Sequence, residues 1–199
     1  MLKTCWKETA MSESIRSFLA FDIESHEVRN KLAKAQALLV QTGADLKLVE
    51  TQNIHITLRF LGNITPLMVE RVFEEMKTVQ FIPFNVQIKG LGAFPDILHP
   101  RVVWAGIIEG QDQLRSVFSQ LEPRLRELGF AADPKGFSAH LTLARVRSGR
   151  NKAQLAKVLT ENANYDFGTI RADCLRLKQS VLSPKGPLYS TLKEFCPNP

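Results

Sequence analysis

A four-residue pattern of histidine, an apolar residue, threonine and leucine occurs twice in this chain of 199 residues. The first copy is His55-Ile56-Thr57-Leu58, and the second is His140-Leu141-Thr142-Leu143. Both copies stand in apolar segments typical of strands. Two of the four histidines therefore occupy equivalent places in two strands, which indicates two related lobes.

Alternation along a strand places the histidine and the threonine of each copy on one face and the apolar residues on the other. If the lobes face each other across a cleft, His55, Thr57, His140 and Thr142 converge there. A neutral imidazole can take a proton from water, and a protonated one can give a proton to a leaving oxygen. Threonine hydroxyls can hold phosphoryl oxygens between the rings, and imidazolium and arginine charge can replace a metal.

Simpler roles for the histidines compete with this interpretation. A single His-x-Thr strand is better explained by a packed, half-buried histidine, but two copies favour a site. His26 is typical of a helix start, and His99 precedes Pro100 in a loop. The chain has no HExxH, no HxH and no acidic cluster, and Gly90-x-Gly92 lacks the rest of a phosphate-binding loop. We therefore expect no metal and no cofactor.

Closely spaced strands between helices predict an α+β fold with largely antiparallel sheet. Pro123 predicts a kink or break in its helix, and a Gly/Pro-rich loop is expected over 92–100. The expected strands are 15–22, 46–49, 53–61, 84–90, 101–108, 139–146, 167–172, 175–182 and 188–195. The expected helices are 28–39 with a stop at Gly43, 66–79 after the cap Thr65, 111–128 and 152–160.

The composition, 44% hydrophobic and 23% charged, is that of a globular protein. No apolar run is long enough to span a membrane, and the first residues lack the apolar centre of a secretory signal. We therefore expect a cytoplasmic protein with no membrane attachment. The net charge of +6 suits a phosphate-rich partner. Three cysteines without CxxC spacing, Cys5, Cys174 and Cys196, predict reduced thiols.

The first 14 residues are polar and show no period, and Met11 is a candidate for the natural start. We interpret residues 1–14 as an N-terminal extension. No Ser/Gly-rich linker divides the rest of the chain, so 15–199 is expected to form a single domain.

The two motifs, extended as His55 to Gly62 and His140 to Arg145, resemble those of the 2H phosphoesterases. The segments 15–22, 90–95 and 186–189 resemble the branch of RNA 2′,3′-cyclic phosphodiesterases, also called 2′-5′ RNA ligases, and are most similar to archaeal members. The resemblance covers 15–195. It implies a bilobal fold of two pseudo-symmetric lobes, each of mainly antiparallel sheet with outer helices, around a central cleft.

The resemblance also implies hydrolysis of a terminal RNA 2′,3′-cyclic phosphate to a 2′-phosphate. By resemblance, His140 would be the base that activates water, His55 the acid that protonates the 3′-oxygen, and Thr57 and Thr142 ligands of the phosphoryl oxygens. The two motifs are nearly symmetric, so the residues themselves leave open which histidine is the acid and which the base. The implied partners are RNA ends with a cyclic phosphate, including tRNA-like fragments, and the implied state is a monomer.

Phe60 and Arg145 each stand five residues after a motif histidine. The resemblance implies a base-stacking aromatic ring at the first position and a phosphate-binding guanidinium at the second. Strict alternation would place both on the face opposite the histidines, so these roles require a β-bulge or a strand end.

Two alternatives remain open at this point. Ligation of 2′-5′ RNA ends reverses the same chemistry and is expected as a minor activity, because water greatly exceeds 5′-hydroxyl ends. A non-catalytic RNA- or nucleotide-binding module could use the same cleft for recognition, since basic charge and aromatic residues suffice for binding.

Overall fold

The computed structural model describes residues 14–133, 136–184 and 186–197. The proposed N-terminal extension lies outside the described residues, apart from Ser14, as do parts of the turns expected at 133–136 and 183–187. The strands are β1 (Ile15–Asp22), β2 (Leu46–Leu48), β3 (His55–Ile64), β4 (Phe84–Phe94), β5 (Val102–Glu109), β6 (His140–Val146), β7 (Asp166–Ala172), β8 (Leu175–Ser183) and β9 (Gly186–Phe195). The helices are α1 (His26–Gln41), α2 (Pro66–Lys77), α3 (Gln111–Glu127) and α4 (Lys152–Glu161), with a short 3₁₀ turn at Thr51–Asn53.

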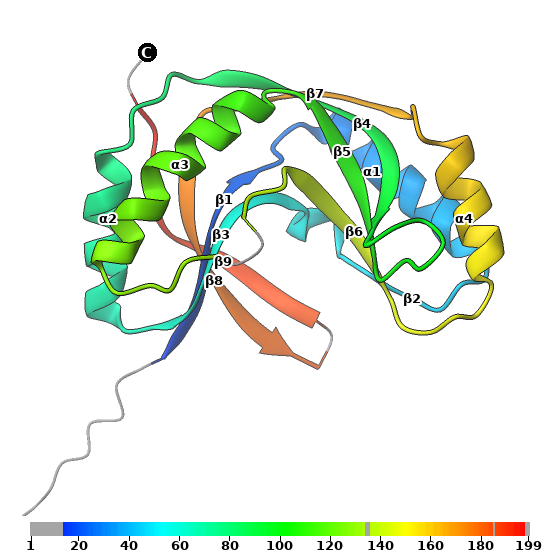
Figure 1. The fold of residues 1–199 in the computed structure, drawn as a ribbon, viewed down its shortest axis with the longest axis horizontal. Helices are drawn as coiled ribbons and strands as arrows, with labels where there is room; N and C mark the ends of the chain where they lie inside the picture. Colours follow the sequence, from blue (N-terminus) through cyan, green and yellow to red (C-terminus); the bar gives the residue numbers. More distant parts are fainter. Residues whose placement is uncertain (1–13, 134–135, 185, 198–199) are drawn as a thin grey trace, which may run out of the picture.

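The described strands form one antiparallel sheet in two halves (Figure 1). The strand order is β7-β4-β5-β6-β3-β1-β8-β9, and β2 pairs with the free part of β6. The halves meet where Ile56 of β3 pairs with Leu141 of β6. The predicted α+β fold with two lobes is confirmed, and the lobes are halves of a single sheet.

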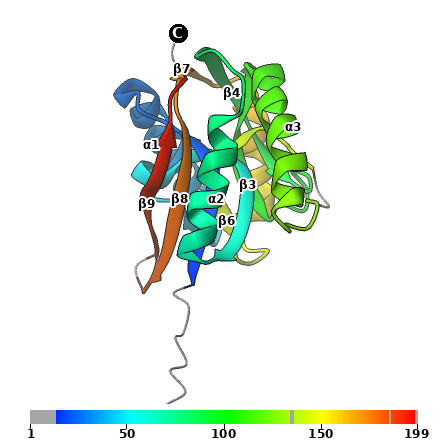
Figure 2. The same cartoon turned by 90° about the vertical axis from the view of Figure 1, so that its left-hand side faces the viewer.

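Helices exchanged between the halves hold the two lobes together (Figures 1 and 2). The helix α1 follows β1 in sequence but packs against β7, β6 and α4 in the other half. The helix α3 follows β5 but packs against α2 and β3 as well as β5. Each lobe is therefore covered partly by a helix that follows a strand of the other lobe. In this way α1 contacts the motif strand β6, and α3 contacts the motif strand β3.

Local sequence explains where the helices begin and which face they bury. Thr65 caps α2 by accepting a hydrogen bond from the Met68 amide, with Pro66 at the first helical position. The buried face of α2 is formed by Val69, Val72 and Met76, which recur at helical spacing. The predicted cap at Thr65 is therefore confirmed.

Two expectations about strand ends were wrong, and of the kink or break expected at Pro123 the break does not occur. The helix α3 runs through Pro123 without a break. Pro123 has no amide hydrogen, so the carbonyl of Ser119 lacks its helical hydrogen-bond partner. Both residues are exposed, so water can donate to that carbonyl. Strand β3 continues past Gly62 to Ile64, and β4 extends to Phe94 into the expected loop, because pairing with β1 and β5 overrides the local turn signals.

The expectation of reduced thiols was also wrong for two cysteines, since Cys174 and Cys196 form a disulfide. Cys174 precedes β8 and Cys196 follows β9, next to the pair formed by Leu175 and Phe195. The antiparallel register therefore brings the two side chains opposite each other, an arrangement that spacing in the sequence does not indicate. Cys5 lies outside the described residues.

No described helix is both long enough and apolar enough to cross a membrane.

Candidate active site

Each motif strand contains a β-bulge immediately after its threonine. Along β1, the partner of Leu19 is Arg59 and the partner of Ala20 is Thr57, so Leu58 is skipped. Along β5, the partners of Val103 and Trp104 are Ala144 and Thr142, so Leu143 is skipped. The bulge required for Phe60 and Arg145 to share a face with the histidines is therefore present in both motifs.

The burial pattern follows from these bulges. In β3, Leu58 and Arg59 are buried in succession, and Phe60 is 59% exposed. In β6, Leu143 and Ala144 are both buried, and Arg145 is exposed. Phe60 and Arg145 consequently line one pocket together with His55, Thr57 and Thr142.

The pairing of Ile56 with Leu141 determines how the four polar motif residues lie relative to one another. The antiparallel register places His55 beside Thr142 and Thr57 beside His140. The two histidines are then diagonal neighbours, for which separations of about 7–8 Å are typical, with the Cβ atoms somewhat closer. His140 is not among the residues that line the pocket of about 460 Å³, but a proton on its ring would lower the pKa of His55.

Both rings are oriented by the same kind of hydrogen bond. Nδ1 of His55 lies 2.7 Å from the Asn53 carbonyl oxygen, and Nδ1 of His140 lies 2.7 Å from that of Ser138. A carbonyl oxygen can only accept, so Nδ1 carries the proton in each ring. In both histidines Nε2 is thus the atom left to take up or release a proton.

Burial disfavours the protonated form of both histidines. Burial lowers the pKa of His55 to about 4, and the positive charge of Lys178 also contributes. Burial likewise lowers the pKa of His140 below its ordinary value of 6.5. A negatively charged ligand between the rings would raise both values, because it favours the protonated imidazole.

The pocket combines apolar and aromatic residues with three cations that form its basic rim. Arg16, Lys47 and Arg145 line it, and the carboxylate among its lining residues is that of Glu50. Glu50 accepts hydrogen bonds from the side chains of Gln52 and Asn53. The hydroxyls of Thr57 and Thr142 have no hydrogen-bond partner among the described residues. The pocket therefore offers unpaired donors to an anion.

Aromatic contacts of the histidines were not anticipated from the sequence. The ring of His55 stacks on Phe18 at 4.6 Å between centroids and meets the edge of Tyr189 at 5.3 Å. His140 has an edge contact with Phe94 at 5.0 Å. Phe18 and Phe94 belong to segments that carry the family resemblance, so that signal was available. These rings restrict the imidazoles and cause much of their burial.

Two buried polar side chains hold the segments that precede the histidines. Gln36 donates to the carbonyls of Val49 and Leu143 and accepts from the Thr51 hydroxyl, which links α1 to both motif regions. Arg59 donates to Glu122 of α3 at 2.9 Å and to the carbonyl of Ala131. The chain from Ala131 leads to Ser138, whose carbonyl orients His140.

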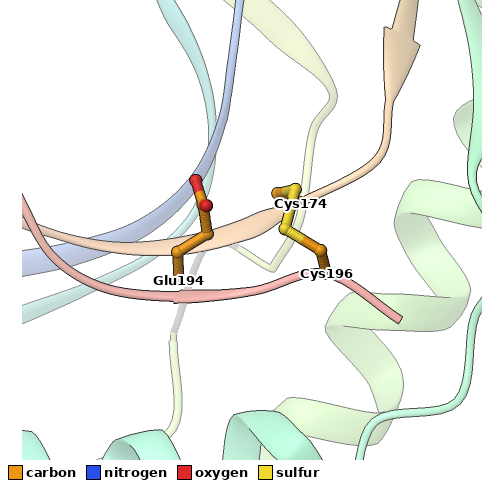
Figure 3. Close-up of side chains that lie close together, drawn as sticks. All are labelled: Cys174, Glu194 and Cys196. Atoms are coloured by element: carbon orange, nitrogen blue, oxygen red, sulfur yellow. A yellow bond between two sulfur atoms is a disulfide. The ribbon is translucent and has the colours of Figure 1, made fainter. Parts of the chain in front are cut away.

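Potential metal ligands gather at one place among the described residues, at Cys174, Glu194 and Cys196 (Figure 3). The disulfide occupies both sulfur atoms, so one carboxylate remains as a ligand. This group lies at the ends of β8 and β9 and shares no residue with the pocket. It does not provide a set of ligands for a metal ion.

Comparison with known proteins agrees with this geometry. The LigT-like phosphoesterase family matches residues 23–104 and 108–189, one motif in each segment. The RNA 2′,3′-cyclic phosphodiesterase of Aeropyrum pernix is 38% identical over 82% of this chain and 93% of its own length. The protein of the same name from Archaeoglobus fulgidus is 37% identical over 91% of this chain and 99% of its own.

Among solved structures, E. coli LigT in complex with 3′-AMP has a TM-score of 0.77 at 21% identity. The match covers 92% of this chain and 98% of that one. The fold and the paired motifs define a phosphoesterase with two lobes. The chain belongs to the LigT-like phosphoesterase family.

Proposed function

We propose that residues 15–199 form one two-lobed enzyme that hydrolyses the 2′,3′-cyclic phosphate at the end of RNA to a 2′-phosphate. The observation that carries this proposal is the pair of imidazoles, each with Nδ1 bonded to a carbonyl and Nε2 free, on adjoining strands. The names of the relatives from A. pernix and A. fulgidus support the substrate.

In the proposed reaction, water attacks phosphorus and its proton passes to Nε2 of His140. The bond from phosphorus to the 3′-oxygen breaks, and that oxygen takes a proton from Nε2 of His55. The phosphate stays on the 2′-oxygen. Base and acid stand on opposite sides of phosphorus, as displacement in line requires. The diagonal placement of the two rings supports a pair that flanks phosphorus, and the family resemblance supports the assignment of base and acid.

Thr57 and Thr142 donate to the phosphoryl oxygens, because their hydroxyls are free and stand beside the histidines. Arg145 adds positive charge at the rim, and Phe60 offers an exposed ring for the terminal base. The substrate's negative charge raises the pKa of the acid, which lets His55 hold its proton in the complex. Both motifs belong to one chain, which supports a monomer as the active unit.

The test is incubation with a short RNA ending in a 2′,3′-cyclic phosphate, followed by chromatography against synthetic 2′-phosphate and 3′-phosphate standards. We expect the 2′-phosphate, formed equally well in EDTA. A 3′-phosphate product would contradict the assigned leaving oxygen. Turnover lost in EDTA and restored by a divalent ion would contradict the metal-independent mechanism. RNA binding without turnover would favour a recognition module.

A further inference from the structure

A second concave surface, the basic groove, has a volume of about 400 Å³ and is lined by Val146 and Arg147, which directly follow Arg145 of the active-site pocket. Arg101, Arg147 and Lys152 line it, together with His99. No carboxylate is among its described lining residues. All three long cations are exposed, and none of them forms an ion pair with a described carboxylate.

The basic groove continues the positive rim of the pocket along β6. Arg145 of the pocket pairs with Lys47 of β2 on one side and with Val102 of β5 on the other. The next residue, Val146, donates its amide to the Arg101 carbonyl, and Arg147 follows it. Lys47 and Arg145 are thus paired on neighbouring strands, and Arg101 and Arg147 stand just outside the adjoining ends of β5 and β6. We call these four residues the basic track.

The acidic residues near this track leave its charge positive. The Asp96 carboxylate accepts from the amides of Leu98 and His99 and lies 3.3 Å from the His99 ring. Asp45, whose carbonyl accepts from the Arg147 amide, is the other acidic residue joined to the track. Glu50 lines the pocket together with Lys47 and Arg145. The five cations of the track and groove outnumber these three carboxylates.

The opposite wall of the pocket has a different character. The β8–β9 hairpin contributes Leu182, Pro187 and Tyr189 there, and Leu182 is 70% exposed. An RNA strand held by its terminal phosphate between the histidines must leave the pocket along one of its walls. Backbone phosphates are bound chiefly by arginine and lysine, so the strand is directed over Arg145 rather than over the hairpin.

We propose that the basic groove binds a backbone phosphate of the RNA strand upstream of the cyclic end. This inference rests on the proposed function and adds to it: the preferred substrate is an oligonucleotide rather than a cyclic mononucleotide. The groove supplies affinity without sequence preference, because contacts to phosphate carry no base information.

The test compares kcat/KM for 2′,3′-cyclic AMP with that for a short oligoadenylate ending in the same cyclic phosphate. We expect the wild type to prefer the oligonucleotide. In the triple variant Arg101→Ala, Arg147→Ala and Lys152→Ala, the ratio of oligonucleotide to mononucleotide kcat/KM should fall about tenfold. General damage to the fold would lower both values and leave their ratio unchanged. Arg126→Ala, which removes an exposed cation on α3, is the control and should leave the ratio unchanged. If the triple variant does not fold, the single variant Arg147→Ala replaces it in the comparison.

Binding of a labelled RNA with a terminal 2′-phosphate, followed by fluorescence anisotropy, tests the groove independently of catalysis. The slope of log affinity against log salt should decrease by about 0.7 for each backbone phosphate that the variant no longer neutralises. An unchanged ratio and an unchanged slope in the triple variant would overturn the inference and leave the proposed function intact. If the wild type hydrolyses neither substrate, the proposed function is wrong, and the anisotropy slopes still decide whether the groove binds RNA.

Discussion

His55 lies diagonally across the sheet from His140, because Ile56 of β3 pairs with Leu141 of β6. The two halves of the sheet meet at this pair, which also places the two imidazoles on one face. The face is shared because both motif strands present histidine and threonine on the same side, with Ile56 and Leu141 fully buried beneath. The same residue pair therefore contributes to the core between the two halves and positions the two proposed catalytic histidines.

Replacing either histidine should abolish turnover without abolishing binding. We expect His55→Ala and His140→Ala each to lower kcat by at least about 100-fold, the usual contribution of a general acid or base. RNA affinity, measured by anisotropy, should stay within about tenfold, because Thr57, Thr142 and Arg145 remain. His26→Ala, at the exposed start of α1, is the matched control. Undiminished hydrolysis in either motif variant would rule out the mechanism.

The pH dependence follows from the lowered histidine pKa values. The active form holds one proton on the pair, and burial lowers the pKa of His55 to about 4 and that of His140 below 6.5. In the free enzyme this form is lost as pH rises above both values, so log kcat/KM should fall with a slope of about −1 above pH 7. At low pH both rings become protonated and the rate falls again, which produces a bell. A flat profile between pH 5 and 9 would argue against catalysis by two histidines, once a rate-limiting step outside chemistry is excluded by viscosity measurements.

The two threonine hydroxyls should act as donors to the phosphate. Thr57→Val and Thr142→Val preserve shape and β-propensity, so the fold is expected to persist while kcat/KM falls by about 100-fold. Thr→Ser at the same positions restores the hydroxyl and should recover most of the activity. Thr169→Val, on the exposed face of β7, is the control. Full activity in the valine variants would show that the hydroxyls do not bind the transferring group.

Ligation should remain a minor activity. When cyclic-phosphate RNA is incubated with a 5′-hydroxyl acceptor, both water and the acceptor can attack the same phosphorus, and water is in large excess. We expect gel analysis to show hydrolysed RNA exceeding the 2′-5′ ligated product. More ligated than hydrolysed RNA would reverse this ranking.

The disulfide between Cys174 and Cys196 should stabilise the fold far from the chemistry. It closes a loop with a sequence separation of 22 residues, for which chain entropy predicts a contribution of about 3 kcal/mol. The double variant Cys174→Ser and Cys196→Ser should therefore lower Tm by about 5–10 °C and lose its response to reductant. Free thiols at both positions in the non-reduced wild type, detected by alkylation and mass spectrometry, would contradict the assignment.

Local patterns were enough to predict most of the elements. Alternation located the motif strands, and the Thr65-Pro66 cap located the start of α2, because both depend on interactions a few residues apart. The family resemblance also implied that Phe60 and Arg145 serve the same site as the histidines. Strand alternation showed that this requires a β-bulge or a strand end. Pro123 and the end of β4 were misjudged, since solvent exposure and pairing with β5 are not local properties.

The sequence by itself determined which reactive groups are present: two imidazoles, two hydroxyls and a surplus of positive charge. It also determined on which face of its strand each motif side chain lies. What only the tertiary structure decided is which distant segments are neighbours. The pairing of Ile56 with Leu141, the exchange of α1 and α3 between lobes and the partnership of Cys174 with Cys196 all depend on strand register and packing across the whole chain. Residues brought together in this way leave no periodic signal in their own neighbourhoods, because the free energy that selects them comes from contacts between segments far apart in the sequence.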